Sequence, residues 1–117
     1  TEVTDAELEH IRLPLALTGS GDFFLLRASG DSMINAGIDS GDLVLIRKQE
    51  TAREGQIVAF LYRNDCTTLK RYHRVSDSEV HLVPENDSLK PIVLKDEQLN
   101  DLRIQGVATM VMKDLDS

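Results

Sequence analysis

One stretch of the sequence decides how the fold is read: Gly30-Asp31-Ser32-Met33-Ile34-Asn35-Ala36-Gly37-Ile38-Asp39-Ser40-Gly41-Asp42-Leu43. It lies between two apolar runs, Phe23–Leu26 before it and Leu43–Ile46 after it. Its glycines and aspartates predict a loop, because glycine reaches positive φ freely and aspartate hydrogen-bonds its own backbone in turns. The flanking runs are short and apolar, so we expect them to be β-strands.

This loop also carries the apolar side chains of Met33, Ile34 and Ile38, which are unusual in a solvated loop. We therefore expect it to pack back onto the core, where it would hold the hydroxyl of Ser32 on a rigid support. Ser32 is then a candidate nucleophile. The alternative interpretation is a well-packed connection in which the serine is incidental, and the stretch taken alone does not separate the two.

The composition bounds the class of protein. The chain has 117 residues, of which 41% are hydrophobic and 28% are charged, as expected for one globular domain with its own core. Aromatic residues make up only 4%, with no tryptophan, so aliphatic side chains must build that core. The formal net charge of −7 makes the chain a poor candidate for binding the phosphate backbone of DNA by itself.

The single cysteine, Cys66, excludes an internal disulfide and is typical of a reducing compartment. It lies in a polar turn, so an incidental role is a simpler interpretation than a thiol nucleophile. His10, His73 and His81 have no spacing to Cys66 that predicts a zinc site, and we expect no metal and no cofactor. No apolar run approaches the about 20 residues of a membrane span, and no signal peptide is recognisable. The sequence therefore predicts a soluble, cytoplasmic protein.

After residue 22 the sequence predicts short strands separated by turns, with little helix. This pattern favours a compact, mainly β domain, either a sandwich or a partly open barrel. Pro91 cannot donate a backbone hydrogen bond, so its segment is expected at an edge of the sheet. The last segment ends the chain and is also expected at an edge, where pairing with a second copy would satisfy its backbone. The expected strands are Phe23–Ala28, Leu43–Ile46, Ile57–Leu61, Thr67–His73, Val80–Val83, Pro91–Leu94 and Leu102–Met112.

Residues 1–22 differ from the rest, and we assign them as an N-terminal arm and loop that precede the domain of residues 23–117. The segment Thr4-Asp5-Ala6-Glu7 has the form of a helix capping box, and Pro14 would end any helix. A short helix and an extended arm are both compatible with this segment.

A second candidate lies in the segment Thr67–His73. Strand alternation places Thr68, Lys70 and Tyr72 on one face. If that face is buried, Lys70 loses hydration, its pKa falls, and the neutral amine becomes a general base that can activate a serine hydroxyl. The alternative, which periodicity alone favours, is a solvated lysine on the outer face of the sheet.

Several motifs in this chain resemble the C-terminal peptidase domain of LexA repressors. Their order and spacing match over roughly residues 23–112, including the separation between Ser32 and Lys70. Co-linear motifs are far more specific than any one of them alone. The motifs are Gly30-Asp31-Ser32-Met33, Gly37-Ile38, Gly41-Asp42-Leu43-Val44, Gly55-Gln56-Ile57-Val58, Thr68-Leu69-Lys70-Arg71, Leu82-Val83-Pro84-Glu85-Asn86 and Lys90-Pro91-Ile92.

The resemblance implies a serine peptidase with a Ser-Lys dyad, in which Ser32 is the nucleophile and Lys70 is the general base. The oxyanion would face the backbone N–H of Ser32 and a neighbouring backbone amide of the same loop, which includes Asp31 and Met33. The implied fold is the barrel-like, mostly antiparallel domain that LexA shares with signal peptidases. The resemblance also implies self-cleavage of one peptide bond, usually Ala-Gly, that is stimulated by RecA filaments and derepresses the DNA-damage (SOS) response. It further implies a homodimer formed through C-terminal strands.

Two features depart from a full repressor. The helix-turn-helix domain is missing, so we expect that DNA binding does not come from this chain. Its acidic charge agrees with that expectation. The Ala-Gly pair at Ala36-Gly37 lies in the loop that holds Ser32, and it cannot reach that serine without dismantling the site. We therefore expect the scissile bond a few residues before Thr1, so that the chain is the C-terminal cleavage product or a fragment cut to match it.

Three related functions are open alternatives on the sequence. A UmuD-like accessory subunit of a translesion polymerase and a phage-type repressor share the same domain, although the segments Pro84-Glu85-Asn86 and Lys90-Pro91-Ile92 look more like LexA. The sequence before Thr1, either a helix-turn-helix domain or only a short arm, would separate the UmuD-like subunit from LexA. A relative of the signal peptidases would use the same dyad, but it needs a membrane anchor, which this sequence does not show.

Overall fold

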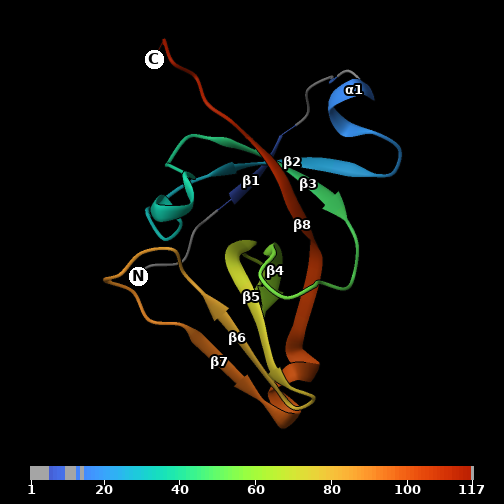
Figure 1. Cartoon of the computed structure of the whole chain (residues 1–117), viewed down its shortest axis with the longest axis vertical. Helices are drawn as coiled ribbons and strands as arrows, with labels where there is room; N and C mark the ends of the chain where they lie inside the picture. The colour runs from blue at the N-terminus through green and yellow to red at the C-terminus, as the bar shows by residue number, and fades with distance from the viewer. Residues whose placement is uncertain (1–5, 10–12, 14, 117) are drawn as a thin grey trace.

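A computed structural model describes residues 6–9, 13 and 15–116 of the chain. In these residues eight strands form one sheet, in the spatial order β1-β2-β3-β8-β4-β5-β6-β7 (Figure 1). Every pair of neighbouring strands is antiparallel, so the predicted mainly β, mostly antiparallel class is confirmed. The strands are β1 (Ala6–Glu9), β2 (Phe23–Ala28), β3 (Leu43–Lys48), β4 (Ile57–Tyr62), β5 (Thr68–Ser76), β6 (Glu79–Val83), β7 (Ile92–Lys95) and β8 (Leu102–Met112).

In the part of the chain that the structure describes, helical pieces are few and short, as the sequence predicted. They are the α-helix α1 (Leu15–Thr18) and the 3-10 turns η1 (Ile34–Ala36) and η2 (Asp96–Asp101). None of the three was predicted individually, because pieces of this length carry no periodic apolar pattern.

The N-terminal arm is extended where the structure describes it. β1 pairs with β2 along its whole length. Of the two alternatives for this segment, the extended arm is therefore correct over Ala6–Glu9 and the short helix is not. Thr4 and Asp5 of the capping box, and Pro14, lie outside the described residues.

The two strands expected at edges have different positions. β7 is the last strand of the sheet, so the edge position that Pro91 predicted is confirmed. β8 lies between β3 and β4, and the expectation that it forms an edge is wrong. Its first part, Leu102–Val107, pairs with β4, and its second part, Gly106–Met112, pairs with β3. Position in the chain does not determine position in a sheet, since strand order depends on which backbone pairings the whole domain makes.

β8 passes from one half of the sheet to the other at Gly106. The register of β8 shifts against both β3 and β4 near this point. A Cβ at Gly106 would lie 2.3 Å from the backbone oxygen of Arg47, so only glycine allows the two strands to approach this closely. The shifts also interrupt the regular alternation of a strand, because Ile104 and Val107, an odd number of positions apart, pack with the same core cluster.

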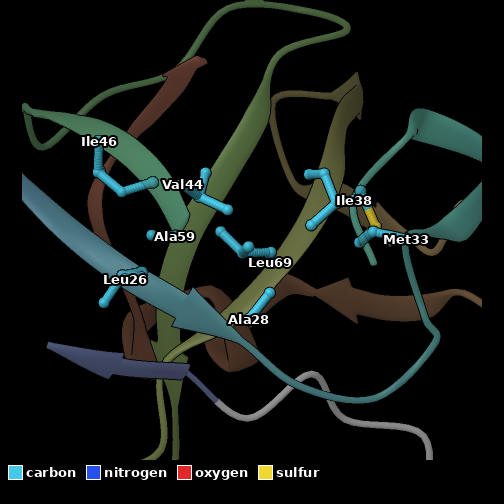
Figure 2. Packing of buried hydrophobic residues seen from close by; sticks show 8 residues of the cluster. All are labelled: Leu26, Ala28, Met33, Ile38, Val44, Ile46, Ala59 and Leu69. Atoms are coloured by element: carbon cyan, nitrogen blue, oxygen red, sulfur yellow. The ribbon is translucent and has the colours of Figure 1, made fainter. Parts of the chain in front are cut away.

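Among the described residues, two clusters of buried side chains fill the domain. The loop of residues 29–42, here called the Ser32 loop, contributes to the first. Met33 and Ile38 are only 1% and 2% exposed, so this loop packs back onto the core as predicted (Figure 2). Ile34 is 42% exposed, contrary to the same expectation, because Met33 takes the buried position beside it. The first cluster holds Leu26, Ala28, Met33, Ile38, Val44, Ile46, Ala59 and Leu69, and the second holds Val58, Phe60, Tyr72, Val80, Leu82, Leu94 and Val107.

Candidate functional site

Ser32 and Lys70, the two candidates from the sequence, are in contact. Ser32 lies in its loop just before η1, and Lys70 lies within β5. The Nζ of Lys70 donates a hydrogen bond to the Oγ of Ser32 over 3.3 Å. Both residues are almost completely buried, with 1% of Ser32 and 2% of Lys70 exposed. The fold thus joins a hydroxyl and an amine that are 38 positions apart in the chain.

The burial of Lys70 follows from the orientation of β5. Thr68 and Tyr72, on the same face of β5, are buried, and so is Val58, which lies opposite Lys70 on β4. Val58 and Tyr72 both belong to the second core cluster, so this face of the strand points into the domain. The solvated lysine on the outer face, which periodicity alone favoured, is therefore wrong.

The Ser32 loop is held in place by the connection between β6 and β7. The N–H of Glu85 donates to the carbonyl oxygen of Ser32 over 2.8 Å, and the N–H of Asn35 donates to the carbonyl of Glu85 over 2.8 Å. The side-chain Nδ2 of Asn86 donates to the carbonyl of Asp31 over 2.9 Å. Sequence reasoning gave Glu85 and Asn86 no role, although both lie in a motif that carries the LexA resemblance.

Inside the loop, Met33 and Gly37 define the turn that follows Ser32. The carbonyl of Met33 accepts hydrogen bonds from the N–H groups of Ala36 and Ile38. Gly37 ends η1 in the left-handed region, at φ 82°, which glycine adopts without strain. Asp31 is exposed, and it supports the loop through its backbone carbonyl, which accepts the hydrogen bond from Asn86. Asp31 and Met33 therefore shape the backbone around Ser32.

The far end of the same loop is tied to the residue that follows β8. The Nζ of Lys113 donates to the carboxylate of Asp39 over 2.8 Å and also to that of Asp42. Asp42 is buried, and its carboxylate also accepts the N–H of Asp39. The hydrogen bonds to Asp39 and Asp42 raise the pKa of Lys113 above its usual value. No sequence signal pointed to this cluster, because Lys113 is 74 and 71 positions away from the two aspartates.

The other candidates from the sequence lie away from Ser32 or outside the described residues. Cys66 is exposed, and its N–H donates to the side chain of Asn64, which is the geometry of a turn. His73 bonds to Glu54 and holds the pKa of that carboxyl below its usual value. His10 is outside the described residues. Within those residues, no group of three or more His, Cys, Asp or Glu side chains is placed to hold a metal ion. The described part of the chain also has no helix long and apolar enough to cross a membrane.

The fold is thus an antiparallel sheet in which a serine is buried against a lysine. The chain matches the family described as Peptidase S24-like over residues 1–109, and it belongs to that family of serine peptidases.

The curated relatives are more specific. The chain is 46% identical to the LexA repressor of Syntrophotalea carbinolica over 103 residues, which are 88% of this chain and 49% of that protein. It is 48% identical to the LexA repressor of Bacillus thuringiensis over 88 residues, which are 74% of this chain and 42% of that protein. With the LexA repressor of Bacillus cytotoxicus it shares 43% identity over 108 residues, 92% of this chain and 50% of that protein. The predicted resemblance to LexA is confirmed, and the chain spans about half the length of these relatives.

Proposed function

We propose that this chain is the catalytic and dimerisation domain of a LexA-like transcriptional repressor, and that it hydrolyses a peptide bond of the repressor with Ser32 and Lys70. The observation that carries the proposal is the buried contact between the Nζ of Lys70 and the Oγ of Ser32, at 3.3 Å. Membership of the Peptidase S24-like family supports a serine nucleophile. In this proposal the cleavage inactivates the repressor in the cytoplasm during the SOS response, with a RecA filament as the stimulus.

The proposed reaction begins with a neutral Lys70. Burial favours the uncharged form of an amine, because the ammonium would lose its hydration. The neutral Nζ accepts the hydroxyl proton of Ser32 while Oγ attacks the carbonyl carbon of the scissile peptide. The oxyanion that forms would be stabilised by backbone N–H groups of the Ser32 loop.

The second half of the reaction restores both residues. The protonated Lys70 gives its proton to the leaving nitrogen, the C–N bond breaks, and an ester remains on Ser32. A water molecule attacks this ester while Nζ accepts one of its protons, and the proton passes to Oγ as the ester bond breaks. The net reaction consumes one water and requires no metal or cofactor.

Recognition of DNA is assigned in this proposal to a helix-turn-helix domain outside the chain. The net charge of −7 and the coverage of about half of each LexA relative both support that division. A UmuD-like polymerase subunit and a phage-type repressor are the alternatives. The identity to proteins named LexA repressor favours a LexA-like repressor over both.

The proposed homodimer would form through the second half of β8. Pairing of β8 with β4 ends at Val107, whereas pairing with β3 continues to Met112. Over the described residues, the backbone of Ala108–Met112 therefore has a strand on one side in the sheet register. A second copy related by a two-fold axis could pair along the other side.

Cleavage in trans of a peptide that contains an Ala-Gly bond tests the proposed chemistry. Ser32→Ala should abolish cleavage and Lys70→Ala should remove nearly all of it, with the circular dichroism spectrum unchanged in both. Lys70→Arg should also be inactive, because a guanidinium keeps its proton at any usable pH. A Lys70→Ala variant that cuts as fast as the parent chain would contradict the mechanism.

A further inference from the structure

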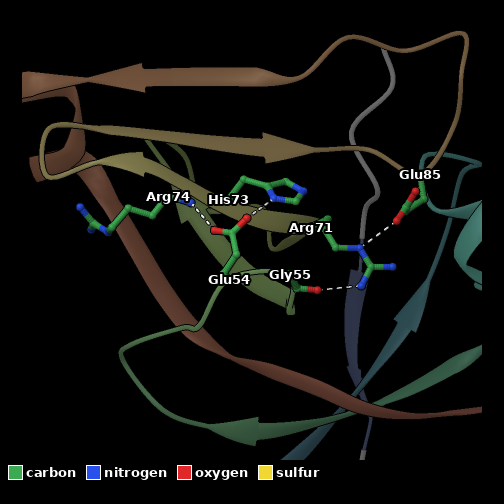
Figure 3. Close-up of polar contacts among 6 residues, drawn as sticks. All are labelled: Glu54, Gly55, Arg71, His73, Arg74 and Glu85. Carbon is green, nitrogen blue, oxygen red and sulfur yellow. Dashed lines mark hydrogen bonds and ion pairs between the residues drawn. The ribbon is translucent and has the colours of Figure 1, made fainter.

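Arg71, the residue after Lys70, makes an ion pair with Glu85. Its Nε lies 2.8 Å from a carboxylate oxygen of Glu85, and both side chains are about one third exposed, at 30% and 31% (Figure 3). A second guanidinium nitrogen of Arg71 donates to the carbonyl oxygen of Gly55 over 2.8 Å. The guanidinium is therefore held at two points, by the β6–β7 connection and by the β3–β4 connection.

Glu85 connects this ion pair to Ser32. Its backbone N–H donates to the carbonyl of Ser32, and its backbone carbonyl accepts the N–H of Asn35. One residue thus binds the Ser32 loop through its main chain and β5 through its side chain. Since Arg71 directly follows Lys70, the contacts form a continuous path from the backbone of Ser32 to the backbone of Lys70.

The carbonyl oxygen of Gly55, the second acceptor for Arg71, is also held in place by backbone hydrogen bonds. The N–H of Gly55 donates to the carbonyl of Tyr72, and the N–H of Tyr72 donates to the carbonyl of Gln56, both over 2.8 Å. The acceptor for Arg71 is therefore anchored to β5 itself. This arrangement leaves the guanidinium little freedom to move along the strand.

We propose that Arg71 and Glu85 are positioning residues that set the distance between the Oγ of Ser32 and the Nζ of Lys70. The inference rests on the proposed function, because this distance matters only if Lys70 takes the hydroxyl proton of Ser32. Ser32 lies on a loop and Lys70 on a strand, and a reaction between two such groups is sensitive to displacements of about 1 Å. The ion pair couples the loop to the strand at the residue next to Lys70.

A purely electrostatic role for Arg71 and Glu85 predicts different variant effects, so experiment can separate it from the positioning role. If charge alone mattered, Glu85→Gln would remove a negative charge near Lys70, favour its neutral amine and make Ser32 more reactive. Arg71→Lys would have no effect, because it keeps the positive charge. In the positioning role both variants make Ser32 less reactive, since an amide binds a guanidinium weakly and a lysine cannot reach Glu85 and Gly55 together.

The test measures how fast Ser32 reacts with a fluorophosphonate probe, with the labelled residue located by peptide mass spectrometry. In this reaction the Oγ–P bond forms, the P–F bond breaks, fluoride leaves and Lys70 takes the hydroxyl proton. Rates are compared at a temperature where circular dichroism shows every variant to be folded. We expect Arg71→Ala to slow labelling by roughly tenfold to a hundredfold, with Glu85→Gln and Arg71→Lys slowed by smaller factors.

The exposed ion pair between Arg63 and Asp101 provides the matched control. It has the same chemistry and a separation of 2.9 Å, and its Asp101 is the last residue of η2, outside the Ser32 loop and the β6–β7 connection. Arg63→Ala should label within about twofold of the parent chain, as expected for an exposed pair. The double variant Arg71→Ala with Glu85→Ala should be no slower than the slower single variant, because the two residues act as one unit.

The outcomes distinguish this inference from the proposed function. If the parent chain is not labelled at Ser32, the proposed function itself fails. If the parent is labelled and Glu85→Gln reacts as fast or faster, the positioning role is overturned. Additive losses in the double variant would overturn it as well, since they would show that Arg71 and Glu85 act separately.

Discussion

Lys70 lies opposite Val58 in the register of β4 and β5, and both side chains are almost completely buried. An apolar neighbour keeps a lysine amine neutral more readily than a carboxylate would, because a nearby negative charge stabilises the ammonium. Under the proposed mechanism, trans-cleavage should accelerate as the pH rises into the alkaline range.

Val58→Asp should move the rising part of this pH profile to higher pH, while Val58→Asn should leave its midpoint in place. The two side chains have nearly the same shape, so the comparison isolates the charge. The measurement is the initial cleavage rate against pH, at a temperature where both variants are folded. Coincident profiles for the two variants would mean that Lys70 does not act as the base.

Met33→Ala should destabilise the domain by about 2–5 kcal/mol, because it removes a fully buried side chain from a packed core. Ile34→Ala, the adjacent position with 42% exposure, should cost less than about 1 kcal/mol. Urea unfolding of both variants checks the difference. Equal losses would show that the Ser32 loop is not anchored to the core through Met33.

Lys113→Gln should lower the stability slightly, and the loss should depend on pH. The carboxylates of Asp39 and Asp42 raise the pKa of Lys113. Its contribution is therefore fully present below the unfolded pKa of about 10.4 and is lost as the pH rises through the higher folded value. The urea midpoints of parent and variant should differ at neutral pH and converge in strongly alkaline solution. A difference that grows with pH would exclude this ion cluster as the cause.

Sedimentation equilibrium should detect a homodimer at high micromolar concentration. Met110→Glu, in the part of β8 that pairs only with β3, should weaken it, because a partly buried apolar side chain is replaced by a charge. Val93→Glu makes the same replacement on β7, where the side chain is 42% exposed, and should leave association unchanged. A parent chain that stays monomeric throughout would contradict the proposed dimer.

Much of the fold and the two candidate residues could be predicted from the sequence. Turn residues and short apolar runs located the strands from Phe23 onwards, because these signals act within a few neighbouring residues. The same local reasoning correctly predicted that Met33 and Ile38 pack inward, wrongly included Ile34, and named Ser32 and Lys70 as candidates, whereas their roles came from the resemblance to LexA. The membership of a family of serine peptidases likewise followed from the order of short motifs.

Tertiary structure decided what local patterns leave open. Alternation placed Thr68, Lys70 and Tyr72 on one face of β5 but could not say that this face points into the domain. Chain order suggested an edge position for β8, whereas its pairings with β3 and β4 place it inside the sheet. The contacts of Glu85 with the Ser32 loop and with Arg71 were not predicted, although Glu85 lies in one of the motifs that resemble LexA. These features depend on which distant segments pair, and that choice minimises the free energy of the whole sheet, whereas a periodic pattern reports only the preferences of one segment.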